Sequence, residues 1–143
     1  MVSFRASDLV IKAIGVTAIL FGIVTLISGG NALFVLLELA EPPAKIVPFV
    51  LYFNFAAGFV YIVTGVGLFL RLRWAPVFAT LIAAATTVVF VGLGVWIFVG
   101  NAYEGRTVIA MTLRAAFWCV ASFISINRNR TLPAQSTDQP SNE

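Results

Sequence analysis

Four long apolar runs limit what this chain can fold into. They cover residues 11–33, 47–70, 75–99 and 107–126. As a helix, each run is long enough to cross a hydrocarbon core about 30 Å thick. The chain is 60% hydrophobic and 10% charged, whereas roughly a quarter of the residues in soluble domains are charged. The sequence therefore predicts an all-α membrane protein, in which residues 1–126 form one bundle of four transmembrane helices.

Lysine and arginine at the ends of these runs predict the orientation. Six of them fall on one side of the bundle: Arg5, Lys12, Arg71, Arg73, Arg128 and Arg130. Lys45 and Arg106 fall on the other side. Because short cytoplasmic loops carry the excess of positive residues, both termini are expected in the cytoplasm. The net charge of +3 then reflects topology, so the expected partner is the lipid bilayer and not a nucleic acid.

Arg114 needs an explanation because it lies inside the fourth run. A charged side chain inside a bilayer costs at least ~2.5 kcal/mol, and it normally faces a bundle interior, a water-filled cavity or an acidic partner. On a helix, Arg114 shares one face with residues at three- and four-residue spacing: Thr107, Ala110, Met111, Phe117, Trp118 and Ala121. We expect this face to point inward.

The sequence leaves two interpretations of Arg114 open. In the first, it snorkels to the headgroups or forms a structural ion pair, for which Glu38 at the outer end of the first helix is the expected partner. In the second, it binds a ligand. Asn54 and Tyr61 share a face of the second helix, and Asn54 lies about 9 Å below its outer end. A ligand site would combine Arg114, Asn54 and Tyr61, with Glu38 or Glu41 at its entrance.

Glycines recur at seven-residue steps, which place them on one face of a helix. They are Gly15, Gly22 and Gly29 on the first helix, and Gly58 and Gly65 on the second. Small residues let membrane helices approach closely, since lipid tails provide no hydrophobic drive for association. We expect the small-residue grooves of the first and third helices to pack against each other or against a partner protein, including a second copy. Leu26 is assigned to the opposite face of the first helix.

Two further expectations concern the outer end of the first helix and the C-terminal segment. Residues 32–40 form either a short interfacial helix at the outer surface or a continuation of the first helix to Glu38. Glu41-Pro42-Pro43 then ends the element, because a proline disfavours the helical conformation of the residue before it. Residues 127–143 are polar and are expected to form a disordered cytoplasmic tail.

The composition also excludes several kinds of chemistry. The chain has no histidine, which removes imidazole-ligated metal and haem sites and the usual Ser-His and Cys-His nucleophiles. Cys119 is the only cysteine, and we expect it to be a small core residue. No carboxylate lies near a membrane centre, so a proton relay of intramembrane acids is not expected. We therefore expect no metal, no cofactor and no catalytic activity.

Two stretches resemble known membrane proteins. The first runs from Phe53 to Tyr61 (FNFAAGFVY) and continues to Trp74, and the second covers residues 103–114. Over residues 29–118 the chain resembles a set of small, uncharacterised bacterial four-helix membrane proteins that are similar in build to the DoxX-like group. The resemblance implies a bacterial inner membrane. Members of the DoxX-like group are linked to respiratory or thiol redox complexes, but this chain lacks the cysteine pair that a thiol-redox role needs.

These features favour a non-catalytic accessory or scaffold subunit of a membrane complex, in which Arg114 is structural. The alternative is a carrier or binding protein for a small solute or anion, with a polar site around Arg114 that opens to the outer face. The carrier needs a polar cavity between the second and fourth helices at the depth of Arg114. The scaffold needs a dry core and an exposed groove of small residues.

Overall fold

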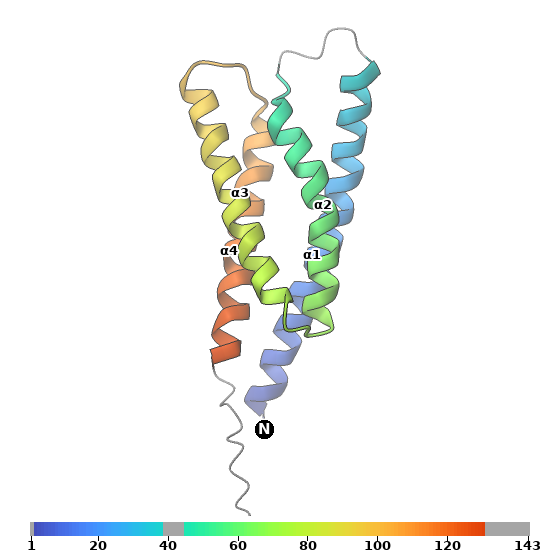
Figure 1. Cartoon of the computed structure of the whole chain (residues 1–143), viewed down its shortest axis with the longest axis vertical. Coiled ribbons are helices and arrows are strands. Elements are labelled where there is room, and N and C mark those ends of the chain that lie inside the picture. Colours follow the sequence, from blue (N-terminus) through green and yellow to red (C-terminus); the bar gives the residue numbers. More distant parts are fainter. Residues whose placement is uncertain (1, 39–44, 131–143) are drawn as a thin grey trace, which may run out of the picture.

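The computed structural model describes residues 2–38 and 45–130, and these form a bundle of four α-helices (Figure 1). The helices are α1 (Val2–Glu38), α2 (Pro48–Phe69), α3 (Ala75–Phe98) and α4 (Gly105–Arg130). Each contains a stretch long and apolar enough to cross a membrane. The prediction of an all-α chain with four membrane-length helices is therefore confirmed for the described residues.

Two helices extend beyond the predicted ends. α1 is one continuous helix to Glu38, so residues 32–38 do not form a separate interfacial helix. α4 continues to Arg130, so residues 127–130 are helical where the tail was expected to begin. The rest of the expected tail, residues 131–143, lies outside the described residues, as does Glu41.

α1 and α2 pack along their glycines, and we call Gly15, Gly22, Gly58 and Gly65 the glycine interface. A Cβ atom at Gly15 would lie 2.7 Å from the carbonyl oxygen of Gly65, and one at Gly65 would lie 2.8 Å from that of Gly15. One at Gly22 would lie 2.8 Å from the carbonyl oxygen of Gly58. These distances are too short for a side chain, so the two backbones touch because all four positions are glycine.

The glycine interface corrects two expectations. The groove on α1 packs against α2, and α1 has no substantial contact with α3 among the described residues. Leu26 lies on the same face as Gly22, because four residues make little more than one helical turn. A Cβ atom at Gly58 would lie 2.8 Å from Cγ of Leu26, so Leu26 packs on α2 and does not face away from it.

α3 and α4 form the second closely packed pair (Figure 1). Ala75, Ala79 and Ala83 are buried on α3, at the four-residue spacing of one face. The hydroxyls of Thr80 and Ser122 are 2.8 Å apart and join the two helices. The fold is thus two antiparallel helical hairpins, α1–α2 and α3–α4, that enclose a shared core.

Arg71 lies in the turn between α2 and α3 and connects this turn to α1. Arg71 has φ 59°, the left-handed conformation that commonly ends a helix but is costly for a residue with a side chain. The N–H of Leu72 donates to the carbonyl of Gly67 at 2.8 Å, which closes the end of α2. Nη2 of Arg71 also lies 2.6 Å from Oδ2 of Asp8. The turn is therefore tied to the first part of α1.

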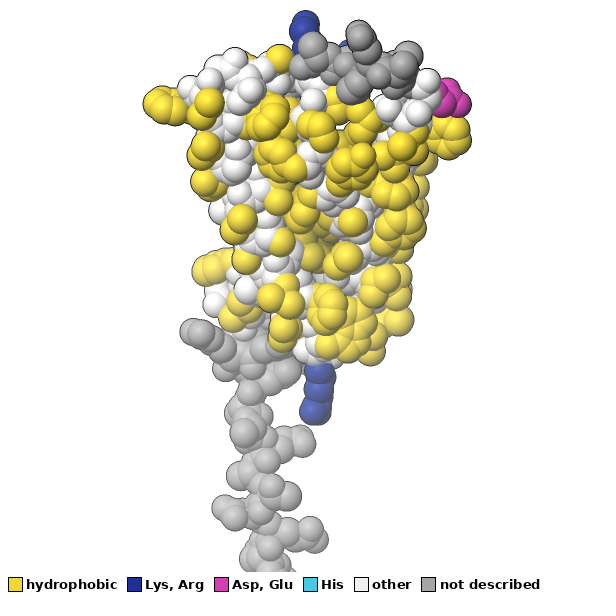
Figure 2. All heavy atoms as spheres, turned by 45° about the horizontal axis from the view of Figure 1, so that its top comes forward, with side chains coloured by type: hydrophobic (Ala, Val, Ile, Leu, Met, Phe, Trp, Pro, Cys, Tyr) yellow, Lys and Arg dark blue, Asp and Glu magenta, His cyan; other side chains and the backbone are white. Residues whose placement is uncertain are grey.

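The lateral surface is apolar. Figure 2 shows hydrophobic side chains over the sides of the bundle in view, with charged side chains at its two ends. Large exposed hydrophobic residues occur on all four helices, for example Leu37, Phe59, Val88 and Phe123. In water such a surface would drive aggregation, whereas in a bilayer it contacts lipid. The apolar surface is thus consistent with four helices that are long enough to cross a membrane.

Candidate functional site

Arg114 lies on the inward face of α4, between the buried residues Met111 and Trp118. Its Nη2 atom donates a hydrogen bond to Oγ1 of Thr25 on α1, at 3.2 Å. Its Cζ atom lies 5.8 Å from the centroid of the Phe21 ring, which is a cation–π distance. The predicted inward direction of this face is therefore observed, and the side chain crosses the interior to α1.

The guanidinium has few partners for a group at this depth. It carries five N–H donors, and one hydrogen bond to a described residue is formed. Nε is buried without an acceptor among the described residues. A buried charge normally requires a counter-charge or several hydrogen bonds, because its desolvation costs several kcal/mol. Nε is closed off by its burial from the polar cavity beside the guanidinium, so the terminal N–H groups are the donors of Arg114 that remain for a further acceptor.

A polar cavity of about 260 Å³ lies against this guanidinium. It is enclosed by α1, α2 and α4 and extends to the end of the bundle where α2 and α4 begin. Its polar lining residues are Thr25, Ser28, Asn54, Glu104, Arg106, Thr107 and Arg114. The N-termini of α2 and α4, which carry partial positive charge, both lie at this end. The cavity thus combines formal and partial positive charge.

Asn54 supplies the second polar group of the cavity. It lies six residues after Pro48, about 9 Å along α2, and its residue is only 9% exposed. Its Oδ1 atom is buried without a donor among the described residues. Asn54 and Arg114 come from helices that are far apart in the sequence, and the structure brings them to the same cavity.

Tyr61 does not line this cavity, although its face of α2 is the face of Asn54. It is fully buried in an aromatic layer below Arg114, which consists of Phe21, Tyr61, Phe117 and Trp118. Four ring contacts close this layer, with centroid distances from 4.9 to 6.4 Å. The hydroxyl of Tyr61 lies 3.4 Å from Oγ1 of Thr86. The aromatic layer therefore forms the floor beneath the guanidinium.

The expected ion pair between Arg114 and Glu38 is not formed. Because α1 is continuous, Glu38 lies 13 residues beyond Thr25, about 20 Å along the helix. Glu38 is exposed at the end of α1, and the position opposite Arg114 is occupied by Thr25. The correction is that Arg114 has a neutral hydroxyl partner on α1 in place of a carboxylate.

The sequence interpretation missed four polar residues of the cavity, which are Thr25, Ser28, Glu104 and Arg106. Thr25 is the hydrogen-bonding residue on the glycine face of α1, and its position between Gly22 and Gly29 was the available signal. Glu104 and Arg106 lie where α4 begins, and Nε of Arg106 is 3.8 Å from Oε1 of Glu104. Among the described residues, these two charged side chains, rather than Glu38, lie at the cavity entrance.

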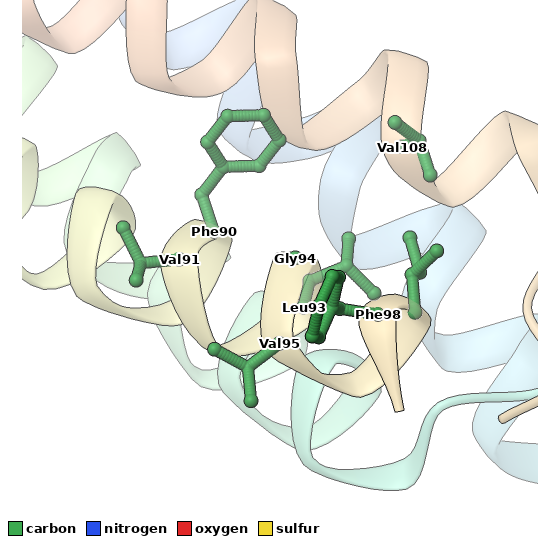
Figure 3. A pocket seen from close by; sticks show the side chains of 8 residues that line it. Phe90, Val91, Leu93, Gly94, Val95, Phe98 and Val108 are labelled. Carbon is green, nitrogen blue, oxygen red and sulfur yellow. The ribbon is translucent and has the colours of Figure 1, made fainter. Parts of the chain in front are cut away.

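A second hollow, of about 460 Å³, lies near the end of α3 (Figure 3). Its lining is apolar and includes Phe90, Leu93 and Phe98 of α3 and Val108 of α4. It offers no titratable or hydrogen-bonding side chain, so it does not provide a chemical site. The polar cavity at Arg114 is the stronger candidate.

Other reactive groups do not form a site in the described part of the chain. Among these residues, no cluster of three or more His, Cys, Asp or Glu residues could hold a metal ion. Cys119 is exposed, which corrects the expectation of a core position. Trp118 and Ala121 take the inward positions of this turn, so Cys119 points about 100° away from the buried face.

Comparison of this chain with protein-family models, with curated proteins and with solved structures found no match. The resemblance to DoxX-like membrane proteins therefore stays a prediction, and the site is interpreted from its own geometry.

Proposed function

We propose that this chain is a membrane protein that binds a small anion in the polar cavity at Arg114, as a binding protein or carrier. The observation that carries the proposal is a guanidinium with one hydrogen bond at the inner end of a polar cavity. A cation with unused donors has a strong preference for an oxyanion. Asn54 lines the same cavity from another helix, and its side-chain N–H₂ group can donate a second hydrogen bond to an anion. No catalytic step is part of this proposal.

The scaffold hypothesis has weaker support. It needs an exposed groove of small residues, but Gly15 and Gly22 are in contact with α2 and are unavailable to another protein. It also needs a dry core, whereas the cavity at Arg114 has a polar lining. The packed glycines and the polar cavity therefore both favour a binding protein over a scaffold.

We further propose that the protein lies in a bacterial inner membrane with both termini in the cytoplasm. The excess of lysine and arginine at one end supports this orientation. The cavity would then open at the periplasmic surface.

Anion binding is tested by replacing Arg114 with glutamine. The wild type, in phosphatidylcholine nanodiscs, is expected to bind acetate in isothermal titration calorimetry. Arg114→Gln should raise the Kd roughly 10- to 150-fold, because a hydrogen bond to a charged group contributes about 1.5 to 3 kcal/mol. Arg73→Gln removes an exposed arginine outside the cavity and serves as the control. Equal Kd values for all three proteins would reject the proposal.

The orientation is tested by cysteine labelling in a Cys119→Ser background. Leu72 lies in the turn between α2 and α3, and Ala102 lies in the turn between α3 and α4; both are exposed. In intact cells, a membrane-impermeant maleimide should label Ala102→Cys and leave Leu72→Cys unlabelled until the cells are lysed. The reverse pattern would place the termini outside.

A further inference from the structure

We infer that the ligand is a short-chain monocarboxylate, whose carboxylate lies against Arg114 and whose alkyl chain lies against the start of α2. This inference rests on the proposed anion binding and specifies the class of anion. Three features of the cavity carry it: its net charge, its size and its apolar wall.

The charge of the cavity favours a single negative charge. Its charged lining residues within the described part of the chain are Arg114, Arg106 and Glu104, which sum to a net charge of +1. Arg106 and Glu104 are 3.8 Å apart and largely offset each other. A monoanion neutralises the remaining guanidinium, whereas a dianion would leave a buried negative charge without a partner, which is costly.

The size of the cavity limits the length of the ligand. A water molecule takes up about 30 Å³ of liquid volume, so a cavity of about 260 Å³ holds roughly nine groups of that size. A monocarboxylate with nine non-hydrogen atoms has seven carbon atoms. Acids up to about heptanoate are therefore expected to fit inside the cavity, and the end of a longer acid would extend through its opening.

One wall of the cavity is suited to an alkyl chain. Ile46, Leu51 of α2 and Ala110 of α4 are half-buried and give the cavity an apolar side. Val47 and Val50 lie behind this side in the core. The polar groups of Arg114 and Asn54 lie deeper along the same helices. A phosphate or sulfate ion would satisfy the guanidinium but would leave this wall in contact with water, which forgoes the gain from burying apolar surface.

The test measures the Kd of a series of acids in phosphatidylcholine nanodiscs by calorimetry. From acetate to hexanoate, affinity should rise about threefold to fourfold for each added methylene, which corresponds to ~0.8 kcal/mol, and the gain should end near heptanoate. Butyrate should bind at least tenfold more tightly than succinate, a dianion with the same number of carbon atoms. Equal affinity for succinate, or no dependence on chain length, would overturn the inference.

Filling the cavity provides a second, independent measurement. Ala110→Leu should shorten the longest acid that still gains affinity by two or three carbon atoms, when each Kd is compared with the Kd of the same variant for acetate. Ala116→Leu adds the same side chain on an exposed position of α4 and should change nothing. If Ala110→Leu leaves the whole series unaltered, the alkyl chain does not lie in this cavity.

The outcomes separate this inference from the proposed function. If acetate, phosphate and succinate all bind in an Arg114-dependent way with similar Kd values, anion binding stands and the monocarboxylate assignment fails. If no anion depends on Arg114, both fail.

A phosphate headgroup of the surrounding lipid is the other source of a monoanionic oxygen ligand. Nanodiscs that contain phosphatidylglycerol distinguish it from a soluble acid. An anionic surface at about −30 to −50 mV weakens the binding of any monoanion roughly threefold to sevenfold. Weakening of butyrate within this range supports the soluble acid, and a larger loss would show that the lipid occupies the site and would overturn the inference.

Discussion

Replacing Gly15 with alanine should lower the free energy of unfolding by about 3 kcal/mol, near the upper end of the usual cost of overpacking. A Cβ atom at this position would lie 2.7 Å from the carbonyl oxygen of Gly65 and 2.8 Å from the backbone nitrogen of Phe69. Both contacts are with backbone atoms, which cannot move aside as a flexible side chain can. α1 would have to separate from α2 along the glycine interface.

Gly94→Ala is the matched control for this prediction. Gly94 also lies within a helix, α3, but a Cβ atom there meets nothing within 4 Å. Because alanine favours the helix over glycine by about 1 kcal/mol, Gly94→Ala should be neutral or stabilising. Thermal unfolding of the purified variants in detergent measures both effects. Equal Tm values for the two variants would contradict backbone contact at Gly15.

Arg114→Met should raise stability by about 1 to 3 kcal/mol in the absence of added anions. Replacing even a buried ion pair with apolar residues of similar volume is often neutral or stabilising, by about 1 to 4 kcal/mol, and a charge without a counter-charge has less attraction to lose. The change removes a guanidinium that has one hydrogen bond and one cation–π contact. The same variant should lose anion binding. This combination is expected when a residue is retained for function at a cost in stability.

Unfolding of Arg114→Met in chloride-free buffer, with a bulky sulfonate as the counter-ion, measures this effect. Thr25→Val removes only the hydroxyl partner and serves as the comparison; it should destabilise the protein, because it leaves the guanidinium with no hydrogen bond to a described residue. A clear loss of stability in Arg114→Met would show that Arg114 is a structural contact between α4 and α1, and would favour the scaffold hypothesis.

The sequence predicted the helices because each has a strong local signal. The lengths of the apolar runs predicted all four helices, and the spacing of Met111, Arg114 and Trp118 predicted the inward face of α4. The buried face of α1, including Gly15 and Gly22, was also visible from spacing. These features depend only on residues of one helix, so one sequence is sufficient to predict them.

Contacts between helices were harder to predict. Small residues occur on α1, α2 and α3, and nothing in their spacing states which two helices pair. The prediction that Glu38 pairs with Arg114 was wrong for two reasons. The sequence did not define where α1 ends, so the depth of Glu38 was misjudged, and the pair was chosen only because the two charges are opposite. Thr25 was not considered as a partner of Arg114, because a threonine in an apolar run is a weak signal. The prediction that Cys119 lies in the core was wrong because it was based on the residue type. The exposure of a residue on a helix depends on which face of the helix it occupies.

The closed aromatic layer under Arg114 has an electrical consequence. Phe21, Tyr61, Phe117 and Trp118 pack just below the guanidinium, so an anion bound as proposed would reach a dead end and would leave by the same opening. Among the described residues, this layer closes the inner end of the cavity. A membrane densely loaded with this protein should therefore conduct no more anionic current than bare lipid and should keep its transmembrane potential, even while the cavity fills and empties.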